Sequence, residues 1–267
     1  MNILFWNLNN KDLSWHIAQL LEEHCIDVAV FAEHRGVDFT RLSSELHSYD
    51  YVQDPGGCDK IAVISRQETK LSIPGSQDRY AICSFLCEGS CFVLAGAHLP
   101  DRRNYSASYV RIESIRRLKV DLEEQGDLLG TSRLIVIGDF NADPFDVELL
   151  QPDAFSAVPF KEVMHERPLR VIQGIEYRHL YNPIPLSLSE GAGMYGSYYF
   201  SNDDYSQYWH CLDQVLVSEV LTDEVRDVRY LKCAGGKSLM KNSRPDVSIS
   251  DHLPLLVSFG GRSDGDE

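Results

Sequence analysis

Six apolar runs in this chain each end in a short polar motif, and the motifs are spread over almost its whole length. An apolar run that ends in a carboxylate, an amide or an imidazole is typical of a buried strand that carries one polar side chain to the edge of a sheet. Six such ends predict one site assembled from distant segments. In chain order the motifs are Phe5-Trp6-Asn7-Leu8-Asn9, Phe31-Ala32-Glu33, Gly96-Ala97-His98-Leu99, Gly138-Asp139-Phe140-Asn141, Cys211-Leu212-Asp213-Gln214 and Ser250-Asp251-His252.

The polar residues of these motifs suit chemistry on a phosphate ester. Carboxylates are the oxygen ligands that a hard divalent cation prefers, histidines can transfer protons, and amides can orient a water or a phosphate. Glu33 closes a buried strand, where a carboxylate must be paired or bind a metal. Asp139 and Asn141 flank Phe140, so strand alternation puts the two polar side chains on one side.

In this order the motifs resemble those of the endonuclease/exonuclease/phosphatase superfamily, the fold of deoxyribonuclease I and of the exonuclease III-type abasic endonucleases. The resemblance runs from Asn7 to His252, and its most specific parts are residues 138–141 and 250–252. It implies a four-layer α-β-β-α sandwich, with two packed, mainly antiparallel or mixed sheets flanked by helices. Periodicity by itself indicates only an α/β or α+β fold.

The resemblance also implies a role for each motif residue. Glu33 and Asp251 would bind Mg²⁺, with Mn²⁺ as a substitute. Asn7 would orient the metal site or the nucleophile and is a further candidate ligand. Asp139 would orient the attacking water, and Asn141 would contact the phosphate.

Three further residues complete the implied catalytic set. Asp213 and His252 would form a carboxylate–imidazole pair, in which the carboxylate fixes the tautomer and stabilises the imidazolium. His252 would act as a base towards water or as a charged phosphate stabiliser, and both roles stay open. His98 would donate to a phosphate oxygen or protonate the leaving group.

The chain departs from the family pattern at two positions. Ala32 stands where the family often has Gln before the metal-binding Glu, so a supporting amide is missing. His210 stands where many abasic endonucleases carry Arg. The second departure weakens the case for repair of abasic sites.

Substrate contacts are expected from a basic strip and an aromatic segment. The strip consists of Arg102, Arg103, Arg111, Arg116, Arg117 and Lys119, and its alternative interpretation is a solvated helix face. Residues 161–208 show little periodicity and are rich in aromatic residues, which would stack on bases or pack ordinarily in strands. The candidate substrate-binding residues are Tyr105, Arg111, Arg178, Asn182 and Trp209.

The hydrophobic pattern predicts the main elements. Residue 143 is expected to cap a helix that begins at Pro144, where proline suits the first turn. Helices are expected from about residue 14, over 38–47 and over about 109–122, and strands over 2–8, 28–32, 60–65, 79–87, 91–98, 134–137, 212–218 and 255–259.

Composition bounds the class of protein. The formal net charge of −15 excludes a broadly basic, non-specific nucleic-acid binder, but a local basic strip and a bound metal are compatible with a nuclease. With no linker or repeat, residues 1–259 are predicted to form one domain, followed by a polar, Gly-rich, disordered tail over 260–267.

No membrane span or signal peptide is apparent. Cys83, Cys87 and Cys91 are expected to be reduced core thiols, which indicates the cytoplasm.

These observations predict a Mg²⁺-dependent phosphodiesterase that hydrolyses nucleic acid, most simply a DNA rather than an RNA endonuclease, by metal-assisted in-line attack of water. The alternative is a phosphatase or phosphodiesterase acting on a small ester such as a nucleotide, an inositol phosphate or a phospholipid headgroup. An inactive binding module is disfavoured because no core motif residue is lost. The oligomeric state is not predicted.

Overall fold

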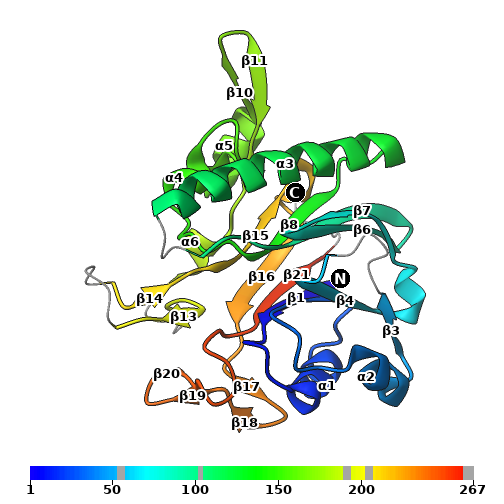
Figure 1. Ribbon diagram of the computed structural model, residues 1–267. Helices are drawn as coiled ribbons and strands as arrows, with labels where there is room; N and C mark the ends of the chain where they lie inside the picture. The colour runs from blue at the N-terminus through cyan, green and yellow to red at the C-terminus, as the bar shows by residue number, and fades with distance from the viewer. Residues whose placement is uncertain (53–57, 102–104, 189–193, 202–206, 261–267) are drawn as a thin grey trace.

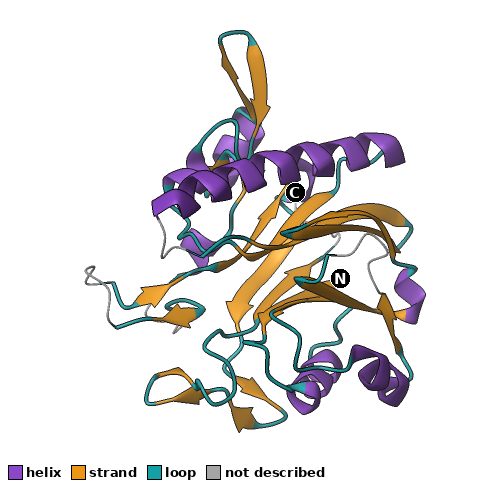
Figure 2. Ribbon diagram, viewed as in Figure 1, coloured by secondary structure: helices purple, strands orange, loops and turns teal. Residues whose placement is uncertain are grey.

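The computed structural model describes residues 1–52, 58–101, 105–188, 194–201 and 207–260, with the backbone alone at residues 52, 74, 76 and 105–107. Within them, two large sheets lie face to face, and helices cover their outer faces (Figures 1 and 2). The predicted four-layer α-β-β-α sandwich is therefore confirmed. The predicted disordered tail falls outside the described residues apart from Gly260.

Both sheets mix parallel and antiparallel pairs. The first sheet has the strand order β16 (Val225–Tyr230), β21 (Leu255–Phe259), β1 (Asn2–Asn7), β2 (Val28–Ala32), β4 (Ile61–Arg66) and β3 (Tyr49–Val52). The second has the order β5 (Ser72–Gln77), β6 (Tyr80–Cys87), β7 (Ser90–His98), β8 (Leu134–Asp139), β15 (Asp213–Val217), β12 (Leu180–Tyr181) and β9 (Ala157–Val158).

Short hairpins and helices complete the fold. The paired short strands are β10 (Leu169–Ile172) with β11 (Ile175–Arg178), β13 (Tyr198–Tyr199) with β14 (Trp209–His210), β17 (Cys233–Ala234) with β18 (Lys237–Ser238), and β19 (Met240–Lys241) with β20 (Arg244–Pro245). The helices are α1 (Ser14–Glu23), α2 (Phe39–Leu46), α3 (Tyr105–Leu129), α4 (Val147–Leu150), α5 (Lys161–Glu166) and α6 (Ile184–Ser187), with 3-10 turns η1 (Gln67–Thr69) and η2 (Glu219–Leu221).

The central strands are apolar at consecutive positions because both faces of each sheet are covered. Every residue of β2 is buried, since the second sheet covers one face of the first sheet and α1 and α2 cover the other (Figure 1). On the outside of the second sheet, Ile115, Leu118 and Leu122 of α3 pack in one cluster with Val93 and Ala95 of β7. The parallel pairs β1–β2 and β7–β8 are joined through α1 and α3, because parallel neighbours need a crossover.

Several local expectations differ from the structure. Asp143 does not cap a helix at Pro144; α4 begins at Val147, preceded by Asp146. The carboxylate of Asp143 instead binds the ring of His210 and the N–H of Cys211. Strands β3, β5, β10, β11 and β16 were not predicted, because they are short, irregular or largely polar.

The structure gives the burial of the three cysteines and bears on the question of a membrane-spanning helix. Cys83 is buried, Cys87 and Cys91 are half-buried, and all three are free thiols. Among the described residues, no helix is long and apolar enough to cross a membrane.

Gly138 lets β7 and β8 approach closely beside the site. A Cβ at this position would lie 2.2 Å from the carbonyl oxygen of Ala97 on β7, and backbone cannot yield as a side chain can. We expect Gly138→Ala to lower the free energy of unfolding by about 1–3 kcal/mol, as overpacking does. Denaturant unfolding measures this change. Gly75→Ala is the matched control, since a Cβ there meets nothing within 4 Å. Equal stability of the two variants would contradict the close approach.

Candidate active site

Strand register brings three predicted site residues together in the second sheet. His98, the last residue of β7, pairs with Asp139 at the end of β8. Asp139 pairs in turn with Asp213, the first residue of β15. The alignment arises because β7 and β8 run parallel and end together, whereas β15 runs antiparallel and begins there. Three motifs far apart in sequence therefore meet at one sheet edge.

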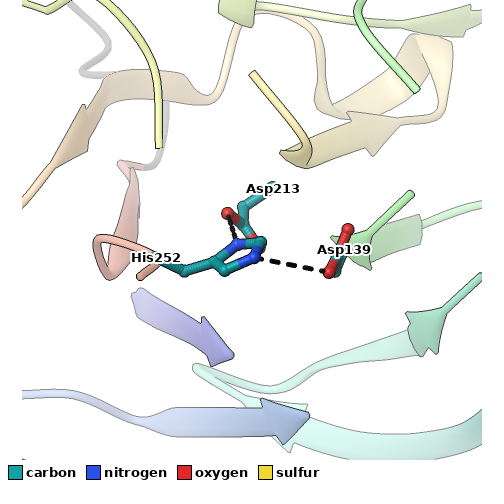
Figure 3. Close-up of side chains that lie close together, drawn as sticks. All are labelled: Asp139, Asp213 and His252. Carbon is teal, nitrogen blue, oxygen red and sulfur yellow. Dashed lines mark hydrogen bonds and ion pairs between the residues drawn. The ribbon is translucent and has the colours of Figure 1, made fainter. Parts of the chain in front are cut away.

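Asp213 and His252 form the expected carboxylate–imidazole pair (Figure 3). His252 Nδ1 lies 2.7 Å from Asp213 Oδ2, and Asp213 is fully buried. Because the carboxylate accepts, Nδ1 carries a proton and the ring turns Nε2 towards Asp139 Oδ2, 3.9 Å away. This places the imidazole between two carboxylates.

The surroundings of His252 favour its charged form. Burial by itself lowers the pKa of His252, but the negative charges of Asp213, Asp139 and Asp251, with the hydrogen bond that Nδ1–H donates to Asp213, raise it to about 10. In the metal-free protein these surroundings therefore favour the imidazolium over the neutral ring.

Hydrogen bonds from the first sheet hold the backbone around His252. Ser250 Oγ donates to the carbonyl of Asn7 at 2.8 Å and accepts from the N–H of His252 at 3.1 Å. Trp6 Nε1 donates to the carbonyl of His252 at 2.9 Å, and the ring of Tyr198 lies 4.9 Å from the imidazole. Sequence reasoning assigned no role to Trp6, and it expected Tyr198 to stack on bases or to pack ordinarily in a strand, not to contact His252.

Asn7 joins the carboxylates of the two sheets. Its Nδ2 lies 3.1 Å from Asp139 Oδ2 and 3.4 Å from Glu33 Oε1, while its Oδ1 accepts from the N–H of Asn9. Asn7 thus presents an N–H rather than an oxygen to the site. This orientation fits a positioning role, not the role of metal ligand that was also expected. Asn10 Nδ2 holds the second oxygen of Glu33 at 3.1 Å.

His98 faces the same two carboxylates. Its Nε2 lies 3.6 Å from Glu33 Oε1 and 3.8 Å from Asp139 Oδ2. In the described part of the chain, no lysine or arginine forms a salt bridge with Glu33 or Asp139. The two carboxylates therefore lie beside imidazole and amide groups, and one oxygen each of Asp139 and Asp213 and a ring nitrogen of His252 lie within 4.8 Å of one another.

The turn after β8 holds Asn141 beside Asp139. Asp139 Oδ1 accepts from the N–H of Asn141 at 2.9 Å, and Asn141 Nδ2 donates to the carbonyl of Leu99 at 3.0 Å. Asn141 has a φ of 49°, a left-handed conformation that asparagine tolerates. The Asx turn thus fixes Asn141 within the site. Asp251 is half-buried and contributes negative charge at His252; its role as a metal ligand stays a prediction.

The guanidinium of Arg111 is paired inside the protein and does not face solvent. Its guanidinium is buried, with Nη2 2.7 Å from Glu148 Oε1 and Nη1 on the carbonyls of Pro100 and Asp101. Burial by itself raises the pKa of Glu148, but hydrogen bonds from Arg111 and Ser108 hold it below its usual value. The expected phosphate contact by Arg111 is therefore not retained.

Three residues of the basic strip, Arg111, Arg116 and Lys119, are engaged in the fold, whereas Arg117 is exposed. Arg116 pairs with Asp153, and Lys119 is buried with Nζ on the carbonyl of Arg178. Arg102 and Arg103 lie outside the described residues. The alternative interpretation of the strip, as part of an ordinary helix surface, fits these contacts better than phosphate binding.

The other substrate candidates lie in different places. Asn182 is buried, and its amide bonds Gln214 and the N–H of Ile184, so it supports β15 from within. Arg178 is exposed on the β10–β11 hairpin, which projects beyond α3 on the side away from the sheets (Figure 1). Tyr105 begins α3, but its side chain is outside the described residues. Trp209 is half-buried on β14, one strand away from Tyr198.

Comparison with known proteins assigns the family. The model of the endonuclease/exonuclease/phosphatase family matches residues 4–252, and the chain belongs to this family. Its members are hydrolases that act on phosphate esters, commonly with a divalent metal. Curated protein sequences gave no match.

Solved structures of low sequence identity share the fold. D. rerio TDP2, complexed with a single-strand DNA product, is 17% identical with a TM-score of 0.62, covering 98% of this chain and 99% of that one. Bacteroides thetaiotaomicron mannosyl-6-phosphatase Bt3783 is 16% identical with a TM-score of 0.60, covering 98% and 100%. The human Nocturnin catalytic domain is 19% identical with a TM-score of 0.59, covering 97% and 94%.

Replacing Asp213 with asparagine tests the electrostatic coupling to His252. We expect Asp213→Asn to lower the pKa of His252 from about 10, because burial is then less opposed by negative charge. Imidazole NMR titration of the metal-free protein measures the change. The raised pKa of His252 in the folded protein also means that protonation of the ring stabilises the fold. This contribution to the free energy of unfolding is fully present below pH 6.5 and is lost as the pH rises through about 10.

The control for this titration is Asp223→Asn, which removes a carboxylate beside the exposed ring of His165. This control substitution should leave the pKa of His252 unchanged. A wild-type His252 that titrates near its ordinary pKa of 6.5 would contradict the coupling.

A second prediction separates structural from substrate-binding roles of Arg111. We expect Arg111→Met to lower the free energy of unfolding by about 3–5 kcal/mol, because it leaves the buried carboxylate of Glu148 without its charge partner. Arg111→Met/Glu148→Leu should recover most of the loss. Denaturant unfolding provides the measurement. An Arg111→Met protein of unchanged stability but raised KM would restore the phosphate-contact hypothesis.

Proposed function

We propose that this protein is a Mg²⁺-dependent phosphodiesterase that hydrolyses nucleic acid, most simply an endonuclease acting on DNA. The observation that carries the proposal is the Asp213–His252 pair, turned towards Asp139 beside Glu33 and His98. This arrangement brings a positioned imidazole, paired carboxylates and an amide together between the two sheets, as hydrolysis of a phosphate ester requires.

The residues at this edge fit a hard divalent cation. Oxygens of Glu33 and Asp139 lie on either side of the Asn7 amide, and no described lysine or arginine neutralises them by a salt bridge. About one third of the Glu33 side chain is exposed, which leaves a carboxylate accessible for ligation. Glu33 and Asp251 would hold Mg²⁺, or Mn²⁺ in its place. When bound, the ion would neutralise charge on the phosphoryl group and its leaving oxygen.

The side chains suggest a division of labour in hydrolysis. With its pKa raised, His252 would remain protonated and donate Nε2–H to a non-bridging phosphate oxygen. Asp139, held by Asn7 and the Asn141 N–H, would orient the water for in-line attack and accept its proton. Asn141 would support the charge of the pentacovalent state. His98 would donate to the leaving oxygen.

The second candidate is a phosphatase or phosphodiesterase of small esters, such as nucleotides, inositol phosphates or phospholipid headgroups. The formal net charge of −15 favours it, as does the pairing of Arg111 and Arg116 of the basic strip with carboxylates. The similar structures bear names of both kinds, a complex with single-strand DNA and a mannosyl-6-phosphatase. We propose the cytoplasm as location, because free Cys83, Cys87 and Cys91 suit a reducing compartment.

A matched substrate panel tests the function. It holds single- and double-stranded DNA, RNA, an abasic duplex and small phosphate esters, each with Mg²⁺, Mn²⁺ or EDTA. We expect cleavage of polynucleotide that EDTA abolishes and that Glu33→Gln, Asp139→Asn and His252→Ala each slow by about 10²–10⁴-fold, the worth of a positioned catalytic group. Metal-dependent turnover retained in all three variants would overturn the site assignment. Turnover of small esters alone would establish the second candidate.

A further inference from the structure

A short segment near the C-terminus reverses the charge of the chain. Residues 228–245 carry Arg229, Lys232, Lys237, Lys241 and Arg244 and no acidic side chain, although the formal net charge of the protein is −15. Lys237, Lys241 and Arg244 are exposed on the hairpins β17–β18 and β19–β20. The segment therefore forms a local basic surface on an acidic protein.

In the part of the chain that the structure describes, three cations of this segment form no salt bridge, whereas its Arg229 pairs with Asp227 and several arginines elsewhere in the chain are paired. Arg35, Arg41, Arg79, Arg116 and Arg133 all form salt bridges with carboxylates. Within the described residues, Lys237, Lys241 and Arg244 form none. The neighbouring carboxylate in sequence, that of Asp246, accepts from the N–H and Oγ of Ser248, which lower its pKa, and the charge of Lys241 lowers that pKa further without a salt bridge. Three positive charges thus remain available to a polyanion.

Two of these cations lie over aromatic rings instead. Lys237 Nζ is 3.9 Å from the ring centroid of Trp15, and the Arg244 guanidinium carbon is 5.8 Å from that of Tyr199. Such contacts keep the charge and its donors unneutralised while restricting the side chain. The second contact also joins the basic hairpins to β13, which β20 contacts (Figure 1).

The aromatic rings around Tyr199 lie on the strand pair β13–β14 and beside it, and β13 also contacts His252. Tyr199 stacks on Tyr208 at 6.0 Å and meets Trp209 edge-on at 5.5 Å. Tyr208 is 52% exposed. The next residue along β13, Tyr198, has its ring 4.9 Å from that of His252. Because successive side chains of a strand point to opposite faces, Tyr199 and its neighbours lie on the face of β13 opposite Tyr198, and this one strand separates the cluster from the candidate active site.

We propose that this basic–aromatic surface, formed by Lys237, Lys241, Arg244, Tyr199, Tyr208 and Trp209, binds the single-stranded polynucleotide that flanks the scissile phosphate. The inference rests on the proposed nuclease function and names the substrate strand. Lysine and arginine contact the phosphates, and ring faces stack on bases, which a duplex keeps stacked and paired. The surface therefore selects a single strand over a duplex.

The charge test uses two pairs of substitutions with the same change in net charge. Lys241→Ala/Arg244→Ala removes two cations from the surface, and Arg167→Ala/Arg170→Ala removes two exposed ones at the β10–β11 hairpin, beyond α3. Binding of a fluorescent oligothymidylate is measured by anisotropy in EDTA, so that no cleavage occurs. Cleavage of the oligomer and of thymidine 5′-p-nitrophenyl phosphate is measured separately with Mg²⁺.

We expect the surface pair to weaken oligomer binding about tenfold at roughly 0.1 M salt and to reduce the salt-dependence slope by about 1.4. The loss in kcat/KM should be larger for the oligomer than for the small ester. The hairpin pair should change affinity by less than about twofold, because its charges do not face the strand. Equal weakening by both pairs, or equal binding of duplex and single strand, would overturn the proposal.

The aromatic test compares Tyr208→Ala with Phe160→Ala, whose ring is 51% exposed beside α5. We expect Tyr208→Ala to weaken oligothymidylate binding about fivefold or more, and not to weaken binding of an abasic strand of the same length, which has no bases to stack. Phe160→Ala should weaken neither. Wild-type cleavage of oligomer with no effect of any surface variant would refute this inference and leave the nuclease function standing. Absence of all polynucleotide cleavage would instead refute the proposed function itself.

Discussion

The hydrogen bond between His252 Nδ1 and Asp213 Oδ2 is the interaction on which the rest of the site depends. A fully buried carboxylate is tolerated only with a compensating partner, and the imidazolium supplies the charge and the donor. The backbone of Asp213 is held from two directions, by Tyr230 Oη on its carbonyl and Ser197 Oγ on its N–H. Because Tyr230 belongs to the first sheet and Asp213 to the second, the pair is fixed only when both sheets have packed.

The site lies where the two sheets meet, and Asn7 connects residues of both sheets. Its amide contacts carboxylates of Glu33 from the first sheet and Asp139 from the second. The apolar core between the sheets fixes the distance between these carboxylates, which repel each other in the metal-free protein. The fold thus keeps two negative charges close to each other, and a bound cation would neutralise them. Packing in the apolar core offsets the unfavourable free energy of their repulsion.

Motif residues at strand ends were predictable, whereas single charged residues were not. Asp139 and His98 follow apolar strands, and the end of a strand has a defined place in a sheet. Arg111, by contrast, stands on a helix whose sequence does not reveal that Glu148 lies beneath it. Arg178 belongs to a hairpin whose direction no periodicity indicated. The basic segment at residues 228–245 was visible in the sequence, but the contact of its Arg244 with Tyr199 was not.

The sequence by itself determined the class of fold, the positions along the chain of the strands that end in site residues, and the identity of those residues. The reason is that a buried strand requires an apolar run, and each polar motif marks the point where such a run ends. Tertiary structure decided which of the charged groups are available. It paired Arg111 internally, turned the amide N–H of Asn7 to the carboxylates, and left Lys241 and Arg244 without carboxylate partners among the described residues. The physical reason is that pairing and desolvation depend on neighbours from distant segments, which sequence spacing does not encode.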